Sequence, residues 1–111
     1  MAATVPPLLA SPSSAAAYEA LTHALDGIGA YVVEEKKTSL HVTTGKAAFL
    51  GIHPRKSGLR LNIVLSRALE GPRVAKVERV SANRFHNEID VKDPSEVDEA
   101  LVEWLREAYA R

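Results

Sequence analysis

The spacing of apolar residues predicts a helix at the start of the folded part of the chain. From Ser14, apolar side chains recur every three or four residues, the spacing of one face of a helix. The residues on this face are Tyr18, Leu21, Leu25 and Ile28. Ser13 or Ser14 suits the N-cap, and Gly27 with Gly29 suits the left-handed turn that ends many helices.

After these glycines the pattern changes to a period of two, which is typical of strands with one buried face. The clearest example is 59–65, where leucine and isoleucine alternate with Arg60, Asn62 and Val64. Turn-forming residues separate the predicted strands, which cover residues 31–35, 39–43, 47–53, 59–65 and 84–92.

The segment 66–83 has no single interpretation. Residues 66–72 are typical of a loop around Gly71 and Pro72. Val74, Val77 and Val80 are three residues apart, so a short helical turn and irregular packing both remain open.

A second helix is predicted near the C-terminal end. Asp93 suits its N-cap, Pro94 its first position, and Glu96 has capping-box spacing from Asp93. The apolar face of this helix consists of Val97, Leu101, Trp104, Leu105 and Ala108. The order of elements predicts an α+β fold, in which both helices pack on one face of an antiparallel sheet of about five strands.

Length and composition indicate one globular domain. The chain has 111 residues, of which 46% are hydrophobic and 25% charged, and these values suit a single domain. We expect residues 14–111 to form it and residues 1–13, rich in proline and small residues, to be a flexible tail. No apolar run is long enough to cross a membrane and no secretory signal is recognisable, so we expect a cytoplasmic protein without a membrane partner.

The charges cancel over the whole chain but are unevenly distributed. Fourteen basic residues balance fourteen acidic ones. Residues 36–84 hold eleven of the basic residues and only two of the acidic ones, while residues 1–35 and 85–111 are acidic. Such segregation concentrates positive potential on the predicted sheet and its turns, although basic strands that simply complement acidic helices would give the same pattern.

Motifs of common enzyme and cofactor sites are missing. The chain contains no cysteine, no glycine-rich phosphate loop, no HExxH or DxDxDG metal motif and no GxSxG nucleophile elbow. We therefore predict no cofactor and no metal site, and an enzyme is the less favoured class.

Strand alternation predicts a polar face opposite the leucines. If the leucines face the helices, the other side chains share the outer face: His41, Thr43, Phe49, His53, Arg60, Asn62, Arg84 and His86. The turn at residues 54–58 adds Arg55 and Lys56 on a flexible basic tip. Arginine, histidine and amide donors suit phosphate or carboxylate groups, and Phe49 offers a surface for stacking.

Three other interpretations remain open for this face. A solvated polar face is common in antiparallel sheets. The same side chains are also compatible with a protein–protein or homodimer interface. An enzyme with His53 or His86 as general base is the third alternative.

Several segments together resemble a bacterial family of domains of unknown function. They are Lys37–Leu40, Phe49–Leu61, Arg84–His86, Asp93–Asp98 and Trp104–Tyr109, within a resemblance that covers about residues 15–110. Members of this family stand alone or form the C-terminus of longer proteins, some with predicted nuclease-like or "predicted transport" labels. The resemblance implies a helix–sheet–helix order and no established activity or cofactor. It singles out Lys37, Thr38, His53, Arg60, Arg84 and His86, and longer members have one more residue between the equivalents of Phe85 and His86.

These observations predict a small binding module for an anionic partner, either nucleic acid or a phosphorylated small molecule. Arg60 and Arg84 would clamp the anion, with His53 and His86 as hydrogen-bond donors. Lys37, Arg55 and Lys56 would steer it by charge.

Overall fold

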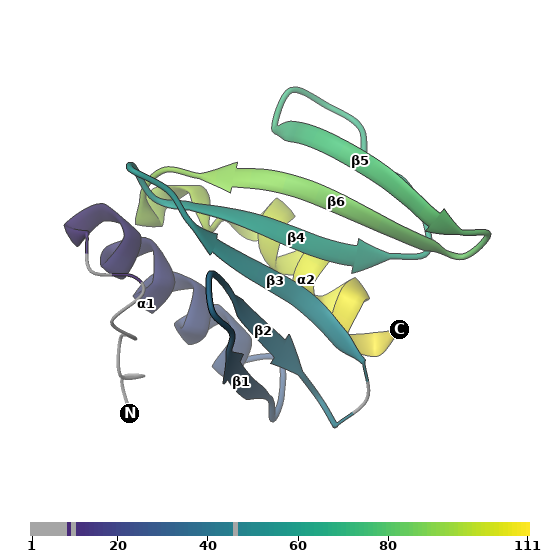
Figure 1. Ribbon diagram of the computed structural model, residues 1–111, viewed down its shortest axis with the longest axis horizontal. Coiled ribbons are helices and arrows are strands. Elements are labelled where there is room, and N and C mark those ends of the chain that lie inside the picture. The colour runs from purple at the N-terminus through teal and green to yellow at the C-terminus, as the bar shows by residue number, and fades with distance from the viewer. Residues whose placement is uncertain (1–8, 10, 46) are drawn as a thin grey trace.

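Two helices cover one face of an antiparallel sheet in the computed structural model of the protein, which describes residue 9, residues 11–45 and residues 47–111 (Figure 1). The elements are α1 (Pro12–Asp26), β1 (Val32–Glu35), β2 (Leu40–Thr43), β3 (Ala48–Pro54), β4 (Leu59–Leu65), β5 (Val74–Ser81), β6 (Arg84–Val91), a short 3₁₀ helix η2 (Pro94–Glu96) and α2 (Glu99–Ala110). The six strands of this part of the chain lie in the order β1-β2-β3-β4-β6-β5. The predicted α+β class is confirmed, with one strand more than the five expected.

The first helix begins two residues before the predicted start. Ser11 is the N-cap: its hydroxyl accepts a hydrogen bond from the Ser14 amide at 3.2 Å, and Pro12 opens the first turn. Leu9 is fully buried in the core. The rest of the predicted tail, residues 1–8 and 10, lies outside the described residues.

The core lies between the helices and the leucine-bearing face of the sheet. Its fully buried large side chains include Leu21 and Leu25 of α1, and Leu101 of α2. From the central strands come Leu40, Leu50, Ile52, Leu59, Leu61, Ile63, Leu65 and Ile89. Alternation of these residues with polar ones therefore identified the buried face of β2, β4 and β6.

Residues 74–81 form a strand at the edge of the sheet, next to β6. Its pairing shifts between Val74 and Lys76 and again between Arg79 and Ser81. Such bulges add a residue to one strand and break the alternation. The three-residue spacing of the valines therefore comes from a bulged strand, which is not among the five predicted strands.

The predicted C-terminal helix is divided in two. Asp93 caps only η2, through a 2.8 Å hydrogen bond from the Ser95 amide. Val97 then leaves the helical conformation, with ψ at 73°. Asp98 caps α2 by accepting a hydrogen bond from the Leu101 amide at 3.0 Å.

Candidate functional site

The face of the sheet away from the helices, called the open face below, carries most of the predicted site residues. His41 lies on β2, His53 on β3, Arg60 on β4, and Arg84 and His86 on β6. The register sets them on the side opposite the core residues of the same strands. Their placement by strand alternation is confirmed.

The placement of Phe49 on the open face is wrong. Val42 pairs with Leu50 and Thr43 pairs with Ala48, so Phe49 is the extra residue of a bulge. Its side chain is 6% exposed and belongs to the core. It meets the ring of Tyr109 on α2 edge to face, with 5.5 Å between ring centroids. Phe49 is therefore not a stacking surface for a ligand.

Arg60 is occupied by carboxylates of the neighbouring strand. Its Nε and one terminal amino group donate to both oxygens of Asp90 at 2.8 and 2.9 Å, and its other amino group lies 3.5 Å from Glu88. The hydrogen bond with Asp90 raises the pKa of Arg60 and lowers the pKa of Asp90. The predicted role of Arg60 as an anion clamp is not supported, because its fork of donors is already filled.

His53 lies over Gly51 on the open face. A methyl group on Gly51 would come within 3.6 Å of the His53 Nε2. Partial burial lowers the pKa of His53 below its ordinary value, and the charge of Glu88 opposes this shift. Near neutral pH, His53 is therefore an uncharged ring with one donor and one acceptor.

The β3–β4 turn is anchored to the start of α1, in contrast to the flexible tip that the sequence suggested. The buried Ser14 hydroxyl lies 2.7 Å from the Gly58 carbonyl and 3.1 Å from the Arg55 carbonyl. The Gly58 amide donates to the Ser13 hydroxyl at 3.1 Å. Gly58 has a φ of +85°, and a Cβ there would lie 1.9 Å from the Val91 carbonyl oxygen. These contacts hold the turn against both α1 and the end of β6.

Basic side chains collect at this end of the sheet, called the hairpin end below. β2 and β4 begin there and β3 and β6 end there, which brings together the β1–β2 turn, the β3–β4 turn and Lys92 (Figure 1). A hollow of about 470 Å³, the hairpin-end hollow, is lined by Pro54, Arg55, Lys56, Ser57, Asp90 and Lys92. Lys37 and Thr38 are exposed in the β1–β2 turn at the same end, outside the lining of the hollow.

Three of the residues that line this hollow are cations that form no close ion pair among the described residues, although the charges of Arg55 and Lys92 contribute to lowering the pKa of Asp90. Arg55, Lys56 and Lys92 are exposed, and none of them forms an ion pair within the described ranges. The single lining carboxylate, Asp90, is bound by Arg60. Lys92 was not among the predicted site residues, because its place beside the turn depends on the pairing of β4 with β6.

A second, smaller hollow lies further along the open face. It has a volume of about 100 Å³ and is lined by His41, Ala48, Leu50, Gly51, Asn62, Val64, Arg84 and His86. We call it the glycine hollow, because Gly51 leaves space in the middle of the sheet. His86 contacts both Arg84 and Asn62 there, at 3.4 and 3.3 Å.

Other arginines of the basic segment contact acidic residues of the helical layer. Arg67 forms two hydrogen bonds of 2.9 Å with Glu107 of α2. Arg73 contacts Asp98 at 2.9 Å and lies 5.7 Å from the ring of Trp104. Part of the charge segregation therefore reflects intramolecular pairing. The cations at the hairpin end are not part of this pairing.

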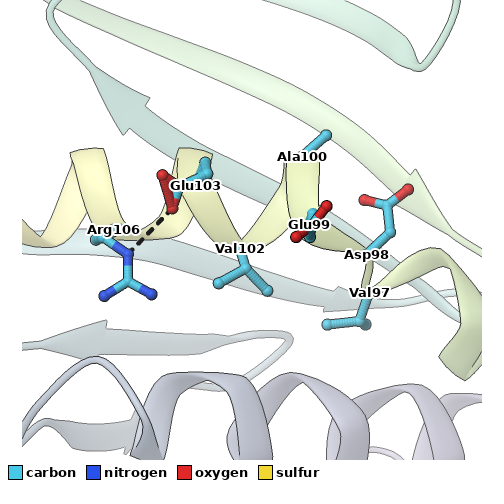
Figure 2. Close-up of a pocket in the computed structure, with 7 residues that line it drawn as sticks. All are labelled: Val97, Asp98, Glu99, Ala100, Val102, Glu103 and Arg106. Carbon is cyan, nitrogen blue, oxygen red and sulfur yellow. Dashed lines mark hydrogen bonds and ion pairs between the residues drawn. The ribbon is translucent and has the colours of Figure 1, made fainter.

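The outer side of α2 has a hollow of about 800 Å³, lined by Val97, Asp98, Glu99, Ala100, Val102, Glu103 and Arg106 (Figure 2). Its charged groups are largely engaged with neighbours. Asp98 caps the helix and contacts Arg73, and Glu103 lies 3.1 Å from Arg106 (Figure 2). Few of its side chains are left to converge on a ligand.

Within residues 9, 11–45 and 47–111, no group of three or more histidine, cysteine, aspartate or glutamate side chains is placed to hold a metal ion. No helix in these ranges is long and apolar enough to cross a membrane.

Among protein-family models, that of a domain of unknown function (DUF5655) matches residues 8–110. No curated protein and no solved structure matches the chain.

Proposed function

Because the chain belongs to the domain of unknown function family DUF5655, we propose its function from its own geometry: it is a binding module that holds phosphate groups at the hairpin-end hollow. The observation that carries this proposal is the meeting of three exposed cations, Arg55, Lys56 and Lys92, beside a hollow whose single carboxylate is engaged by Arg60.

The chemistry of the hollow suits phosphate oxygens. The Arg55 guanidinium offers parallel N–H donors, and the two lysines add compact positive charges. Ser57 contributes a hydroxyl from the same turn. Each of these side chains is exposed, so a phosphate reaches them without opening of the fold.

Anchoring of the turn strengthens this proposal. The hydrogen bonds from Ser14 to the turn carbonyls limit the motion of the backbone that carries Arg55 and Lys56. A held backbone loses less conformational entropy when a ligand binds. The hairpin end is therefore a better phosphate site than an unanchored basic loop.

The remainder of the open face is less suited to a polyanion. Arg60 is neutralised by Asp90 and Glu88, and Glu78 on β5 lies opposite His86 in the strand register. A nucleic acid laid along the sheet would meet these carboxylates. We therefore restrict the contact to the hairpin end, where a strand of nucleic acid or a phosphorylated small molecule presents the same phosphate chemistry.

The test compares two triple variants with equal loss of charge. Arg55→Ala, Lys56→Ala and Lys92→Ala together remove the cations of the hollow. Lys76→Ala, Arg79→Ala and Arg106→Ala remove three exposed cations from other surfaces and serve as the matched control. Fluorescence anisotropy with labelled single-stranded and duplex oligonucleotides, at 50 to 300 mM salt, reports affinity and its salt dependence.

We expect the hollow variant to weaken binding at least tenfold and the control variant less than twofold. With three phosphate contacts, log Kd should change with log salt by a slope of about 2 for a single strand, and the hollow variant should flatten it. If oligonucleotides do not bind, NMR titration with inorganic pyrophosphate decides: saturable shifts at Arg55 to Ser57 identify a small phosphorylated ligand. Absence of binding in both titrations, or equal weakening by both variants, would refute the proposal.

A further inference from the structure

The glycine hollow differs from the hairpin end in the way it is built. Gly51 pairs with His41 on one side and with Asn62 on the other, so the missing side chain leaves space between two polar neighbours. Val64, only 5% exposed, and Ala48 supply aliphatic surface to the same hollow. The result is a small cavity with an apolar part and a polar part.

The arginine of this hollow is not neutralised. No carboxylate is among the residues that line it, and Arg84 forms no ion pair with any other described residue. Arg60, on the same face, contacts Asp90 through Nε and one terminal amino group, and Glu88 through the other amino group. Arg84 therefore keeps its terminal amino groups for a ligand.

Hydrogen-bond polarity leaves donors in the hollow. The Arg84 guanidinium can only donate, so His86 Nε2, at 3.4 Å from Arg84 Nε, must accept. Because Nε2 accepts, a hydrogen on the other ring nitrogen, Nδ1, needs an acceptor. The structure has the amino nitrogen of Asn62 3.3 Å from Nδ1. Since both groups would then be donors, we assign the amide the opposite orientation, with its oxygen towards Nδ1.

The unpaired buried atom of the Asn62 side chain in the structure is Oδ1. The reversed orientation puts the amino group at that position, where the described residues offer it no acceptor. Arg84 and Asn62 both then contribute N–H groups. The carboxylates opposite in the register, Glu78 beside His86 and Glu88 beside Asn62, are not among the lining residues, and Glu88 is contacted by Arg60. An acceptor with negative charge completes both sets of hydrogen bonds.

We propose that the glycine hollow binds the carboxylate group of a small, partly apolar molecule. Arg84 pairs with the carboxylate oxygens, and Val64 with Ala48 contacts the short hydrocarbon part. A volume of about 100 Å³ equals the liquid volume of about three water molecules. It accommodates a carboxylate with one or two carbon atoms attached, such as propionate, and we expect a branched acid to fit less well.

This site is separate from the hairpin-end hollow, so a negative result for one proposal does not affect the other. Gly51 and Arg55 are four residues apart along β3 and its turn, about 13 Å in an extended chain. The two hollows have no lining residue in common.

The test is an NMR titration of the full chain with propionate at constant ionic strength, chloride being replaced by the acid. The reporters are the amide signals of Gly51 and Asn62 and the ring signals of His86. Propionamide has the same size without the charge, and trimethylacetate has the charge with a branched body. Inorganic phosphate tests whether any oxyanion suffices.

Three variants separate the contributions of charge and space. Arg84→Ala removes the cation, and Arg79→Ala on β5 is the charge-matched control. Gly51→Ala fills the hollow with a methyl group, and the nearest atoms would lie 3.4 and 3.6 Å from it, so the fold tolerates the change. Circular dichroism verifies that each variant is folded.

We expect saturable shifts with propionate and a Kd of about 1 mM, a reasonable affinity for five heavy atoms. Propionamide, trimethylacetate and phosphate should bind at least tenfold more weakly. Arg84→Ala and Gly51→Ala should abolish saturation, while Arg79→Ala should preserve it. No saturation with propionate, equal binding of propionamide or phosphate, or unchanged binding in Arg84→Ala would overturn the proposal.

Discussion

Replacement of Asn87 by alanine is expected to lower the free energy of unfolding by about 3 kcal/mol. Asn87 is a fully buried polar residue of β6, on the helix-facing side of the sheet. Its Oδ1 accepts a 2.8 Å hydrogen bond from the Leu69 amide, and its amino group lies 3.2 Å from the carbonyls of Ile63 and Arg67. One side chain thus fixes the β4–β5 loop to the core.

The magnitude follows from the groups that lose their partner. The Leu69 N–H is left buried and unpaired, which costs about 2 kcal/mol. The small void left by the missing amide adds about 1 kcal/mol. For a domain of this size, each kcal/mol lowers Tm by about 4 °C, so the expected loss is about 12 °C.

Two more substitutions separate the hydrogen bonds from the packing. Asn87→Leu fills a similar volume but leaves the same N–H unpaired, and we expect it to remain at least about 1 kcal/mol less stable than the native chain. Asn83→Ala, in the exposed β5–β6 turn, should change stability by less than about 0.5 kcal/mol. Urea denaturation followed by circular dichroism and by Trp104 fluorescence measures these differences.

Hydrogen exchange of the Leu69 amide gives a local measurement. This amide should lose protection in Asn87→Ala before the amides of the central strands do, because the loop opens without the sheet. A native-like stability of Asn87→Leu, or unchanged exchange at Leu69 in Asn87→Ala, would show that the hydrogen bonds of Asn87 are not what holds the loop.

Three further changes test other contacts. Gly58→Ala should destabilise the protein by more than about 3 kcal/mol in thermal denaturation, because its φ is +85° and the new Cβ would lie 1.9 Å from the Val91 carbonyl oxygen; an equal Tm would contradict this. Asp90→Asn should lower the free energy of unfolding by about 1 kcal/mol at pH 7. Because Arg60 lowers the folded-state pKa of Asp90, this difference between variant and native chain should vanish as acid protonates the carboxyl. A stability difference that persists at pH 2 would argue against the pairing. Because the pKa of His53 is lowered in the folded state, the unfolded chain binds a proton at higher pH, and native stability should fall as the pH drops below about 6.5. His53→Gln should reduce the fall in Tm between pH 8 and 5. An identical pH profile of Tm in this variant would contradict a contribution from His53.

Local sequence signals were sufficient for most of the fold. Both helices have a continuous apolar face and a side chain suited to the N-cap, and neither signal depends on distant residues. β4 alternates between buried and partly exposed residues from Leu59 to Ile63, because it lies in the interior of the sheet and has no bulge. The N-terminal boundary was displaced by two residues, because three serines near the start are all suitable caps and only Ser11 takes the position.

The residues that form the site were harder to predict from the sequence, because their neighbours depend on strand pairing. Arg60 has the sequence context of a free surface arginine, and its neutralisation becomes apparent only when Asp90 is found opposite it on β6. Lys92 belongs by sequence to the acidic C-terminal segment, yet the same pairing brings it to the β3–β4 turn. Net charge by segment therefore indicated the right region without identifying which cations remain unpaired.

Bulges explain why the alternation argument failed where it did. Each extra residue turns the side chains that follow it to the opposite face of the sheet. The alternation of inward and outward side chains therefore predicts the face only within a stretch without a bulge. The pairing of β3 with β4 has no register shift, and neither has the pairing of β6 with β4. The histidines and arginines of these strands were therefore assigned to the correct face. The shift beside Val42 carries Phe49 into the core. The shift after Val74 likewise turns both Val74 and Val77 towards Ile89 and Asn87, the partners of a buried face, at a spacing that imitates a helix. The polar face predicted from the sequence thus ends where the first bulge begins. His41, Asn62, Arg84 and His86, which are among the residues that keep their assignment, line the hollow at Gly51.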